Sequence, residues 1–293
     1  MRRHAFRAMG TAVELLVDDD RTPAAAVARA IAEVESVFLR EELRYSRFRG
    51  DSELSRVNAA AGSTTLVSEP FAELLRFSLR QAAGSGGLFD PTVLAAVRAA
   101  GYDRDFDEVL AGARDALRPR AVPCGRWREI GLRGRVLRLP RGVGLDLGGV
   151  AKGWTVDLAA DAAVSAGMPW AVVNAGGDLR VAGSAPAVEV AVEDPADPSA
   201  TIARLSVTAG AVATSSTLRR AWGEGLHHLI DPRTGAPSDT GVVQATVWAP
   251  TCALAEIAAK RALLGGGLGA DPGVVVGGDS DVVMNLEPVE ALA

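Results

Sequence analysis

The sequence predicts an α+β protein with a mixed β-sheet, folded as a single compact unit over residues 1–293. Three observations lead to this prediction. Apolar residues recur at helical spacing in some segments and form short runs in others. Gly-rich turns separate the short runs, as is typical of strands joined by tight connections. Hydrophobic residues make up 48% of the chain, enough for a sizeable core, and no internal repeat or low-complexity linker interrupts it.

The first third of the chain predicts one strand and two helices. The strand is expected at residues 11–17. Thr22-Pro23 then opens a helix, because threonine is a good N-cap and proline suits the first helical position, and its apolar stripe continues to Phe38. The second helix is expected to begin near Ser68 and to end at Gly84.

The rest of the chain predicts short strands and two further helices. Residues 111–139 are rich in Arg and Gly and predict a peripheral hairpin. One helix is expected to end near Gly167, and Thr251 is expected to cap another that runs to Gly265. The expected strands span residues 171–173, 189–192, 203–207, 274–276 and 282–284, the last two as a hairpin.

Charge and composition argue against several classes of protein. The net charge is −5 and the basic residues are dispersed, whereas nucleic-acid binding requires concentrated Lys and Arg. The N-terminus has no apolar stretch of signal-peptide length, and no apolar run is long enough to span a bilayer. We therefore expect a cytoplasmic protein with no nucleic-acid or membrane partner. Cys124 and Cys252 have no metal-ligand spacing around them and are expected to be free thiols.

Two Gly-rich segments are candidates for ligand binding. In residues 84–92 the glycines allow a ligand to approach the backbone, and Asp90 could accept hydrogen bonds from a polar heterocycle. The alternative is a structural turn with Asp90 capping a helix. In residues 144–154, Gly148-Gly149 precedes an expected helix, which suits a phosphate, and Lys152 could add charge. This segment is neither a Walker A loop nor a GxGxxG motif, so its specificity alone is weak.

Two further segments combine turns with reactive side chains. Residues 174–178 predict a strand, a Gly-rich turn and a second strand, with Asn174 and Asp178 either binding a ligand or bonding the backbone. His227 and His228 precede Asp231. A histidine there could take a proton from a hydroxyl while Asp231 orients the ring. The alternative is an Asx turn closed by Asp231, with both imidazoles near the surface.

Taken together and in order, these strings resemble the ApbE family of FAD:protein FMN transferases. The resemblance covers roughly residues 6 to 285. Within the matched segments, Val150 stands where the family has Ile, which is a conservative difference. The matching segments are residues 9–11, 46–58, 87–92, 146–153, 174–178 and 228–235.

The resemblance implies a fold, a reaction and a set of site residues. The implied fold is one α+β unit of two related halves, with FAD in a cleft between them. The implied reaction moves FMN from FAD to a Ser or Thr hydroxyl of a target protein through a phosphoester bond and releases AMP. By position, His228 matches the base that activates the hydroxyl. The positions that would line the FAD site are Met9, Phe48, Leu88, Phe89, Asp90, Asp146 and Lys152.

The resemblance also implies a divalent metal, normally Mg²⁺, and here the sequence departs from the pattern. The family supplies an Asp and a Thr four residues apart on one helix, together with a backbone carbonyl near Gly149. This chain has Glu256 and Lys260 at those two positions. Glu256 can still bind a hard cation, but the ammonium of Lys260 cannot.

Two interpretations of this departure stay open on the sequence. Glu256 and Lys260 could form an i,i+4 ion pair on an exposed helix face. Alternatively, Lys260 occupies the place of the metal and neutralises the FAD pyrophosphate, which makes it a cofactor-binding residue.

The activity expected from the resemblance is FMN transfer. The alternative is a non-catalytic FAD-binding protein, or a weak FAD pyrophosphatase that yields FMN and AMP.

Overall fold

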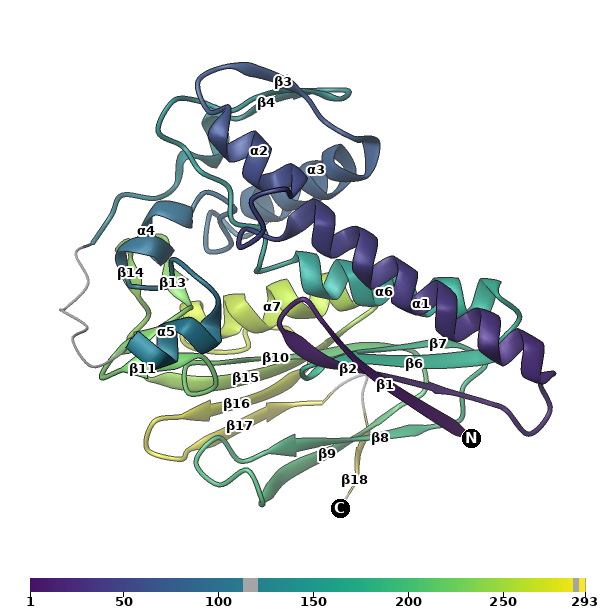
Figure 1. Ribbon diagram of the computed structural model, residues 1–293. Coiled ribbons are helices and arrows are strands. Elements are labelled where there is room, and N and C mark those ends of the chain that lie inside the picture. Colours follow the sequence, from purple (N-terminus) through teal and green to yellow (C-terminus); the bar gives the residue numbers. More distant parts are fainter. Residues whose placement is uncertain (113–120, 287–289, 293) are drawn as a thin grey trace. The chain divides into compact units, whose positions relative to one another are not determined.

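The computed structural model describes residues 1–112, 121–286 and 290–292 (Figure 1). The chain divides into two compact units, each assembled from segments that are distant in sequence. Unit 1 comprises Met1–Glu41, Lys152–Ser216 and Gly241–Ala293, and unit 2 comprises Glu42–Ala151 and Thr217–Thr240. The expectation of one domain over residues 1–293 stays a prediction.

An eight-stranded sheet forms the centre of unit 1, and every strand pairing in it is antiparallel. The predicted mixed sheet is therefore wrong. Tight turns join β1 to β2, β6 to β7 and β16 to β17, and such turns can connect only antiparallel neighbours. The strands, in spatial order, are β1 (Arg2–Ala8), β2 (Thr11–Val17), β6 (Trp170–Ala175), β7 (Asp178–Gly183), β10 (Gly210–Ser216), β15 (Val242–Ala249), β16 (Gly273–Gly277) and β17 (Val282–Asn285).

Helices cover one face of this sheet, as Figure 1 shows. They are α1 (Ala24–Tyr45), α6 (Ala151–Ser165) and α7 (Cys252–Gly265). The core beneath them joins Leu15 of the sheet, Phe38 of α1, Ala160 of α6 and Ala255 of α7. Helix α6 contributes three alanines to that core, Ala159, Ala160 and Ala163, and small side chains allow a helix to pack closely on a sheet.

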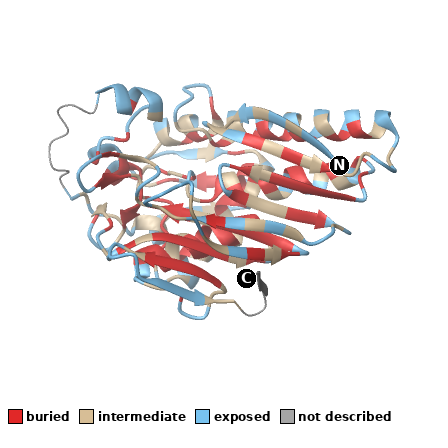
Figure 2. Ribbon diagram, turned by 90° about the horizontal axis from the view of Figure 1, so that it is seen from below, coloured by how far each residue is buried: buried red, intermediate tan, exposed pale blue. Residues whose placement is uncertain are grey.

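A three-stranded sheet covers the other face, with the order β18-β9-β8. A second core, which includes Val172, Val212, Leu205 and Val274, lies between the two sheets of unit 1. Because both faces are covered, the central strands β6 and β10 are buried along most of their length, whereas the edge strand β17 is mostly exposed (Figure 2). The small sheet consists of β8 (Val188–Glu193), β9 (Thr201–Val207) and β18 (Glu290–Leu292).

Unit 2 is built from short helices and small sheets. Its helices are α2 (Glu53–Ala59), α3 (Glu69–Gly84), α4 (Leu94–Ala99), α5 (Phe106–Gly112) and the 3-10 helix η2 (Arg126–Glu129). One sheet has the order β3-β5-β4 and two further sheets have two strands each. Their strands are β3 (Thr64–Leu66), β4 (Gly131–Arg133), β5 (Val136–Arg138), β11 (Ala221–Gly223), β12 (Leu226–His227), β13 (Ile230–Asp231) and β14 (Ala236–Pro237).

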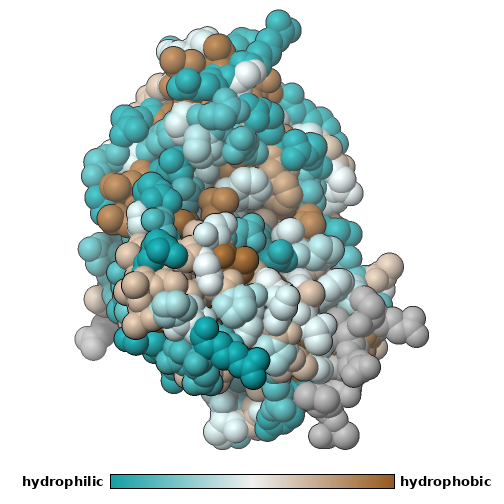
Figure 3. Space-filling view, turned by 90° about the vertical axis from the view of Figure 1, so that its right-hand side faces the viewer, coloured by the Kyte–Doolittle hydropathy of each residue, from teal (hydrophilic) through white to brown (hydrophobic). Residues whose placement is uncertain are grey.

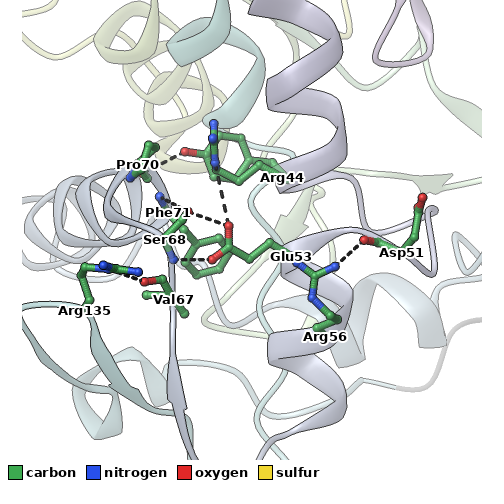
Figure 4. A network of polar contacts seen from close by, with 10 residues as sticks. Arg44, Asp51, Glu53, Arg56, Val67, Ser68, Pro70, Phe71 and Arg135 are labelled. Atoms are coloured by element: carbon green, nitrogen blue, oxygen red, sulfur yellow. Dashed lines mark hydrogen bonds and ion pairs between the residues drawn. The ribbon is translucent and has the colours of Figure 1, made fainter.

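A carboxylate ties the start of α2 to the start of α3 (Figure 4). Glu53, at the first position of α2, accepts hydrogen bonds from the Ser68 backbone N–H at 2.5 Å and from the Ser68 hydroxyl at 2.6 Å. Ser68 in turn caps α3 by accepting from the Phe71 N–H at 3.3 Å. The Arg44 guanidinium lies 3.8 Å from the same carboxylate. This half-buried network fixes two helices of unit 2 to each other.

Most of the predicted elements are confirmed. The strand at residues 11–17, the Ser68 and Thr251 caps, the helix ends at Gly84 and Gly265, and the hairpin of β16 and β17 all form. Within residues 111–139 a hairpin of β4 and β5 forms, although residues 113–120 of that prediction lie outside the described part. The strand β1 was not predicted, because it is polar and mostly exposed.

Two further features of the described residues concern their helices and their thiols. Among the described residues, no helix combines the length and apolar character that a bilayer span requires. On the face drawn in Figure 3, hydrophobic side chains occur in small patches among hydrophilic ones. Both cysteines are free, with Cys252 buried and Cys124 half-buried. Burial raises the pKa of both thiols, that of Cys124 to about 12, so neither is a ready nucleophile at neutral pH.

Candidate functional site

The predicted site residues fall into two groups, one in each unit. Unit 2 contains the predicted base His228 together with Phe48, Leu88, Phe89, Asp90, Asp146 and Gly149. Unit 1 contains Met9, Lys152, Glu256 and Lys260.

In unit 2, Arg47 brings two predicted residues together. Its Nε lies 3.2 Å from a carboxylate oxygen of Asp146, and its guanidinium lies over the Phe48 ring at 4.1 Å and the Tyr102 ring at 4.3 Å. The Arg47 side chain is 7% exposed. Its Nη1 donates to the Tyr102 carbonyl at 2.7 Å, whereas its buried Nη2 has no hydrogen-bond partner among the described residues. Sequence analysis did not select Arg47, although it directly precedes Phe48.

Asp90 holds a turn in unit 2. One oxygen accepts from the Thr92 N–H at 2.7 Å and the Thr92 hydroxyl at 2.6 Å, and the other accepts from the Gly125 N–H at 2.6 Å. The structural alternative is therefore present as an Asx turn just before α4, whose own N-cap residue Val93 makes no side-chain cap. Phe89 is buried beside it and Leu88 is half-buried. A ligand-binding role for these three residues stays a prediction.

The Asp146 segment leads directly into α6. Asp146 accepts from the Gly148 N–H at 2.8 Å, and its own N–H donates to the Pro91 carbonyl at 2.9 Å. Asn58 exchanges two hydrogen bonds with the backbone of Leu145, at 2.7 and 2.9 Å. Since α6 begins at Ala151, the Gly pair at residues 148–149 does precede a helix N-terminus, as predicted.

The two adjacent histidines have different environments. His227 is 5% exposed, and its Nε2 lies 3.0 Å from the Ser238 carbonyl while its Nδ1 accepts from the Leu229 N–H at 3.3 Å. This pattern requires a neutral ring with the proton on Nε2, and burial lowers the pKa of His227. His228 is half-buried, and its backbone N–H donates to the Arg220 carbonyl at 3.3 Å. The alternative in which both imidazoles lie near the surface is wrong for His227.

Asp231 forms the Asx turn that was the second alternative for this segment. Its Oδ1 accepts from the Arg233 N–H at 2.8 Å, and the Arg233 guanidinium binds both oxygens at 2.6 to 3.1 Å. Orientation of the His228 ring by Asp231 stays a prediction.

In unit 1, Met9 occupies the tight turn between β1 and β2. Ala8 pairs with Thr11, so Met9 and Gly10 form a two-residue hairpin loop with φ of 50° and 70°. Such loops favour glycine or asparagine, and a methionine there is strained by about 1–2 kcal/mol. Among non-glycine residues of the described chain, only Met9 and Ser280 have positive φ. Strained residues are often found at functional sites, and a role for Met9 in the site stays a prediction.

Lys152, Glu256 and Lys260 lie in one charged cluster of unit 1, together with Asp178. Lys152 donates to the Asp178 carboxylate and, at 3.0 Å, to the Ala175 carbonyl. Lys260 donates to Glu256 Oε1 at 3.0 Å, while Oε2 accepts from the Gly153 N–H at 2.9 Å. The predicted i,i+4 ion pair therefore forms. The helix face that carries it is not exposed, because the side chains of Glu256 and Lys260 are 4% and 15% exposed.

The cluster keeps Lys152 charged. Burial alone lowers the pKa of Lys152, but the Asp178 and Glu256 carboxylates outweigh burial, so that the pKa is raised. Asp178 pairs with Lys152, whereas Asn174 bonds the backbone as the structural alternative predicts, by accepting from the Gly177 N–H at 3.0 Å. A ligand-binding role for either residue stays a prediction. No local pattern indicates the pairing of Asp178 with Lys152, since the two residues lie 26 positions apart.

A cavity of about 530 Å³ in unit 1 lies away from these residues. Asp161, Arg180, Gly210 and Trp248 are among the residues that line it, and the predicted site residues do not. We assign it no role.

Comparison with known proteins places the chain in a family. A family model described as the ApbE family matches residues 9–270. The FAD:protein FMN transferase of Treponema pallidum is 32% identical over 266 residues, which cover 83% of this chain and 72% of that protein. The FAD:protein FMN transferase of Rhodobacter capsulatus is also 32% identical, over 89% of this chain but only 51% of that protein.

Solved structures share the fold. The ApbE protein of Thermotoga maritima superposes with a TM-score of 0.83 at 23% identity, covering 97% of this chain and 96% of that chain. The flavin transferase ApbE of Vibrio cholerae gives 0.78 at 22% identity, covering 100% and 97%. The predicted α+β class is thereby confirmed. Because the family model and relatives at 32% identity span most of the sequence, this chain belongs to the ApbE family.

Proposed function

We propose that this protein transfers FMN from FAD to a Ser or Thr hydroxyl of an acceptor protein and releases AMP. The observation that carries the proposal is the agreement over most of the chain with FAD:protein FMN transferases of other organisms. The flavin cleft and the two related halves that the resemblance implies stay part of this proposal. So do the flavin-contacting roles of Phe48, Leu88, Phe89, Asp90 and Asp146.

His228 is the proposed base. It takes the proton of the acceptor hydroxyl while the hydroxyl oxygen attacks the phosphorus of the FMN moiety. A new P–O bond to the acceptor forms, the P–O bond of the pyrophosphate breaks, and AMP leaves with the bridging oxygen. His227 is unsuited to this step because hydrogen bonds already engage both of its ring nitrogens.

The residues at the implied metal position do not fit a divalent cation. Both oxygens of Glu256 accept hydrogen bonds, one of them from an ammonium that would repel the ion. We therefore derive no step through a metal.

The Glu256–Lys260 pair favours a second candidate function. If charge neutralisation by a metal is essential for transfer, this protein binds FAD without transferring FMN, or hydrolyses it slowly to FMN and AMP. The two candidates differ in the fate of the flavin: transfer leaves it covalently bound to another protein, and hydrolysis leaves it free.

The test is incubation of the purified protein with FAD and a protein extract of its host. AMP is measured by chromatography, and covalent flavin by fluorescence of protein bands after denaturing electrophoresis. Wild-type protein should give both signals, and His228→Ala should lower both by about 10²–10⁴-fold while FAD still binds.

His4→Ala is the matched control, because His4 is the third histidine of the chain and pairs with Glu35 on the surface of unit 1. It should leave both signals unchanged. AMP release without any fluorescent band would support hydrolysis over transfer. Full activity of the His228 variant would rule out this residue as the base.

A further inference from the structure

The chain contains only two lysines, and both lie in the charged cluster of unit 1. All other basic residues are arginines. Lys152 and Lys260 come from different helices, α6 and α7, and each binds its own carboxylate, Asp178 for Lys152 and Glu256 for Lys260. The two pairs are neighbours, because the Glu256 carboxylate also interacts electrostatically with Lys152. A lysine ammonium is a compact point charge, whereas the guanidinium of arginine is a wide planar fork. An ammonium therefore fits into a narrower space beside a carboxylate than a guanidinium does.

The cluster is balanced in charge. Two carboxylates face two ammonium groups, and their side chains are 2% exposed for Asp178, 4% for Glu256, 15% for Lys260 and 20% for Lys152. Buried charges are tolerated when each has a partner of opposite charge and satisfied hydrogen bonds. Each of these four groups has a partner of opposite charge and at least one hydrogen bond.

A divalent cation at Glu256 would disturb this balance. The ion would add two positive charges next to the Lys260 ammonium, and Lys260 offers it no lone pair. Glu256 would also have to give up its hydrogen bonds to Lys260 or to the Gly153 N–H. In a helix, a residue four positions further on lies on the same face, so Lys260 occupies the position from which a second ligand would reach the ion.

We propose that Lys260 is the resident cation of this cluster: it neutralises Glu256 in place of a divalent metal, and this chain binds FAD without Mg²⁺. The statement on FAD rests on the proposed function, whereas the statement on metal binding does not. One experiment with two separate measurements tests them.

The first measurement is Mn²⁺ binding, followed by the electron paramagnetic resonance signal of the free ion. Mn²⁺ is the probe because it prefers the same oxygen ligands as Mg²⁺. Wild-type protein should show no saturable binding that depends on Glu256. Lys260→Thr should raise the affinity at least about tenfold, since even water-like screening of a +1 and a +2 charge at ~4 Å gives an effect of this size. The double variant Lys260→Thr, Glu256→Gln should lose this gain.

Lys260→Arg is the matched control, because it keeps the charge and should still exclude Mn²⁺. Circular dichroism and thermal unfolding verify that each variant is folded. If Lys260→Thr does not fold, the wild-type measurement still decides. A saturable Mn²⁺ site in wild-type protein that Glu256→Gln removes would overturn the proposal.

The second measurement is FAD affinity, followed by flavin fluorescence with Mg²⁺ and with EDTA. The affinity of the wild-type protein for FAD in EDTA should equal that in Mg²⁺ within about twofold. If EDTA lowers the FAD affinity tenfold or more, the proposal of metal-independent FAD binding is overturned, whatever the outcome for AMP release. If FAD does not bind under either condition, the proposed function fails, and the Mn²⁺ measurement alone judges the role of Lys260.

Discussion

At the scale of single residues, His227 and His228 illustrate how two adjacent side chains of the same type acquire different properties. His227 belongs to β12 and is buried, so it is a structural histidine that must stay neutral. The half-buried neighbour is the better candidate for proton transfer. Because protonating the buried His227 costs free energy, its burial should be detectable in the pH dependence of the free energy of unfolding.

The prediction for His227 follows from its lowered pKa. In the unfolded chain the group titrates near 6.5, and burial shifts the folded-state pKa below that value. The stabilising contribution is therefore complete above pH 6.5 and is lost as the pH falls toward the folded-state pKa, by up to about 1.4 kcal/mol per pH unit. Urea unfolding between about pH 7.5 and about pH 5.5 measures this loss.

His227→Gln is the variant for comparison, since its amide can still donate to the Ser238 carbonyl but cannot be protonated in this range. It should be less stable than wild type at neutral pH, and the difference should shrink as the pH falls. An equal pH dependence in both proteins would show that His227 does not titrate as its burial requires.

Residue-level predictions from the sequence identified turns more securely than ligand contacts. Asp90 and Asp231 were each given a structural and a functional interpretation, and a side-chain turn is observed for both, although Asp90 does not cap α4 as predicted. These bonds span only two positions, so a local pattern can indicate them. The contacts of Arg47 with Asp146 and of Lys152 with Asp178 join distant segments, and no local pattern predicts them.

At the scale of elements, the β1–β2 hairpin combines a regular pairing with a strained loop. The register runs without a break from Arg2–Val17 to Ala8–Thr11, and the strain is confined to Met9. Elements with local signals, such as the helices capped by Ser68 and Thr251, were predicted correctly. The antiparallel sheet was not, because pairing depends on which strands meet after folding rather than on the composition of each strand.

The hairpin gives a prediction that separates stability from binding. Met9→Gly should leave the free energy of unfolding unchanged or raise it by up to about 1 kcal/mol, because glycine removes the strain of positive φ. If Met9 contacts the flavin, the same variant should weaken FAD binding several-fold. Urea unfolding and a flavin fluorescence titration measure the two effects.

Gly10→Ala is the control for the loop, since its φ of 70° disfavours a side chain and the variant should lose about 1 kcal/mol of stability. The opposite result for Met9→Gly, lower stability with unchanged FAD affinity, would show that Met9 serves only to pack the hairpin.

At the scale of the whole molecule, both units are assembled from segments that are distant in sequence. Residues 42–151 and 217–240 form unit 2, and the three segments around them form unit 1. The predicted flavin-contacting residues are found in both units, with Met9 and Lys152 in unit 1. The family resemblance predicted the α+β class from motifs spread over the whole chain, but it could not predict how these segments would be grouped.

This grouping yields a prediction for FAD binding. If residues of both units contact FAD, saturating FAD should slow amide hydrogen exchange in the Met9–Gly10 loop of unit 1 and in the segments around Phe48 and Asp90 of unit 2. A ligand at about 100 times its Kd stabilises the folded state by about 2.7 kcal/mol, so exchange through global unfolding should slow about 100-fold. Hydrogen exchange followed by mass spectrometry measures each segment separately.

The edge strand β17 provides the internal reference for this experiment. It belongs to unit 1 and is mostly exposed, and it contains no predicted site residue, so any slowing there reports stabilisation of the unit as a whole. Slowing at Met9–Gly10 beyond that of β17 indicates direct contact with the ligand. Protection confined to unit 2 would mean that Met9 and Lys152 do not contact FAD, and the flavin assignment would then be restricted to the residues around Phe48, Asp90 and Asp146.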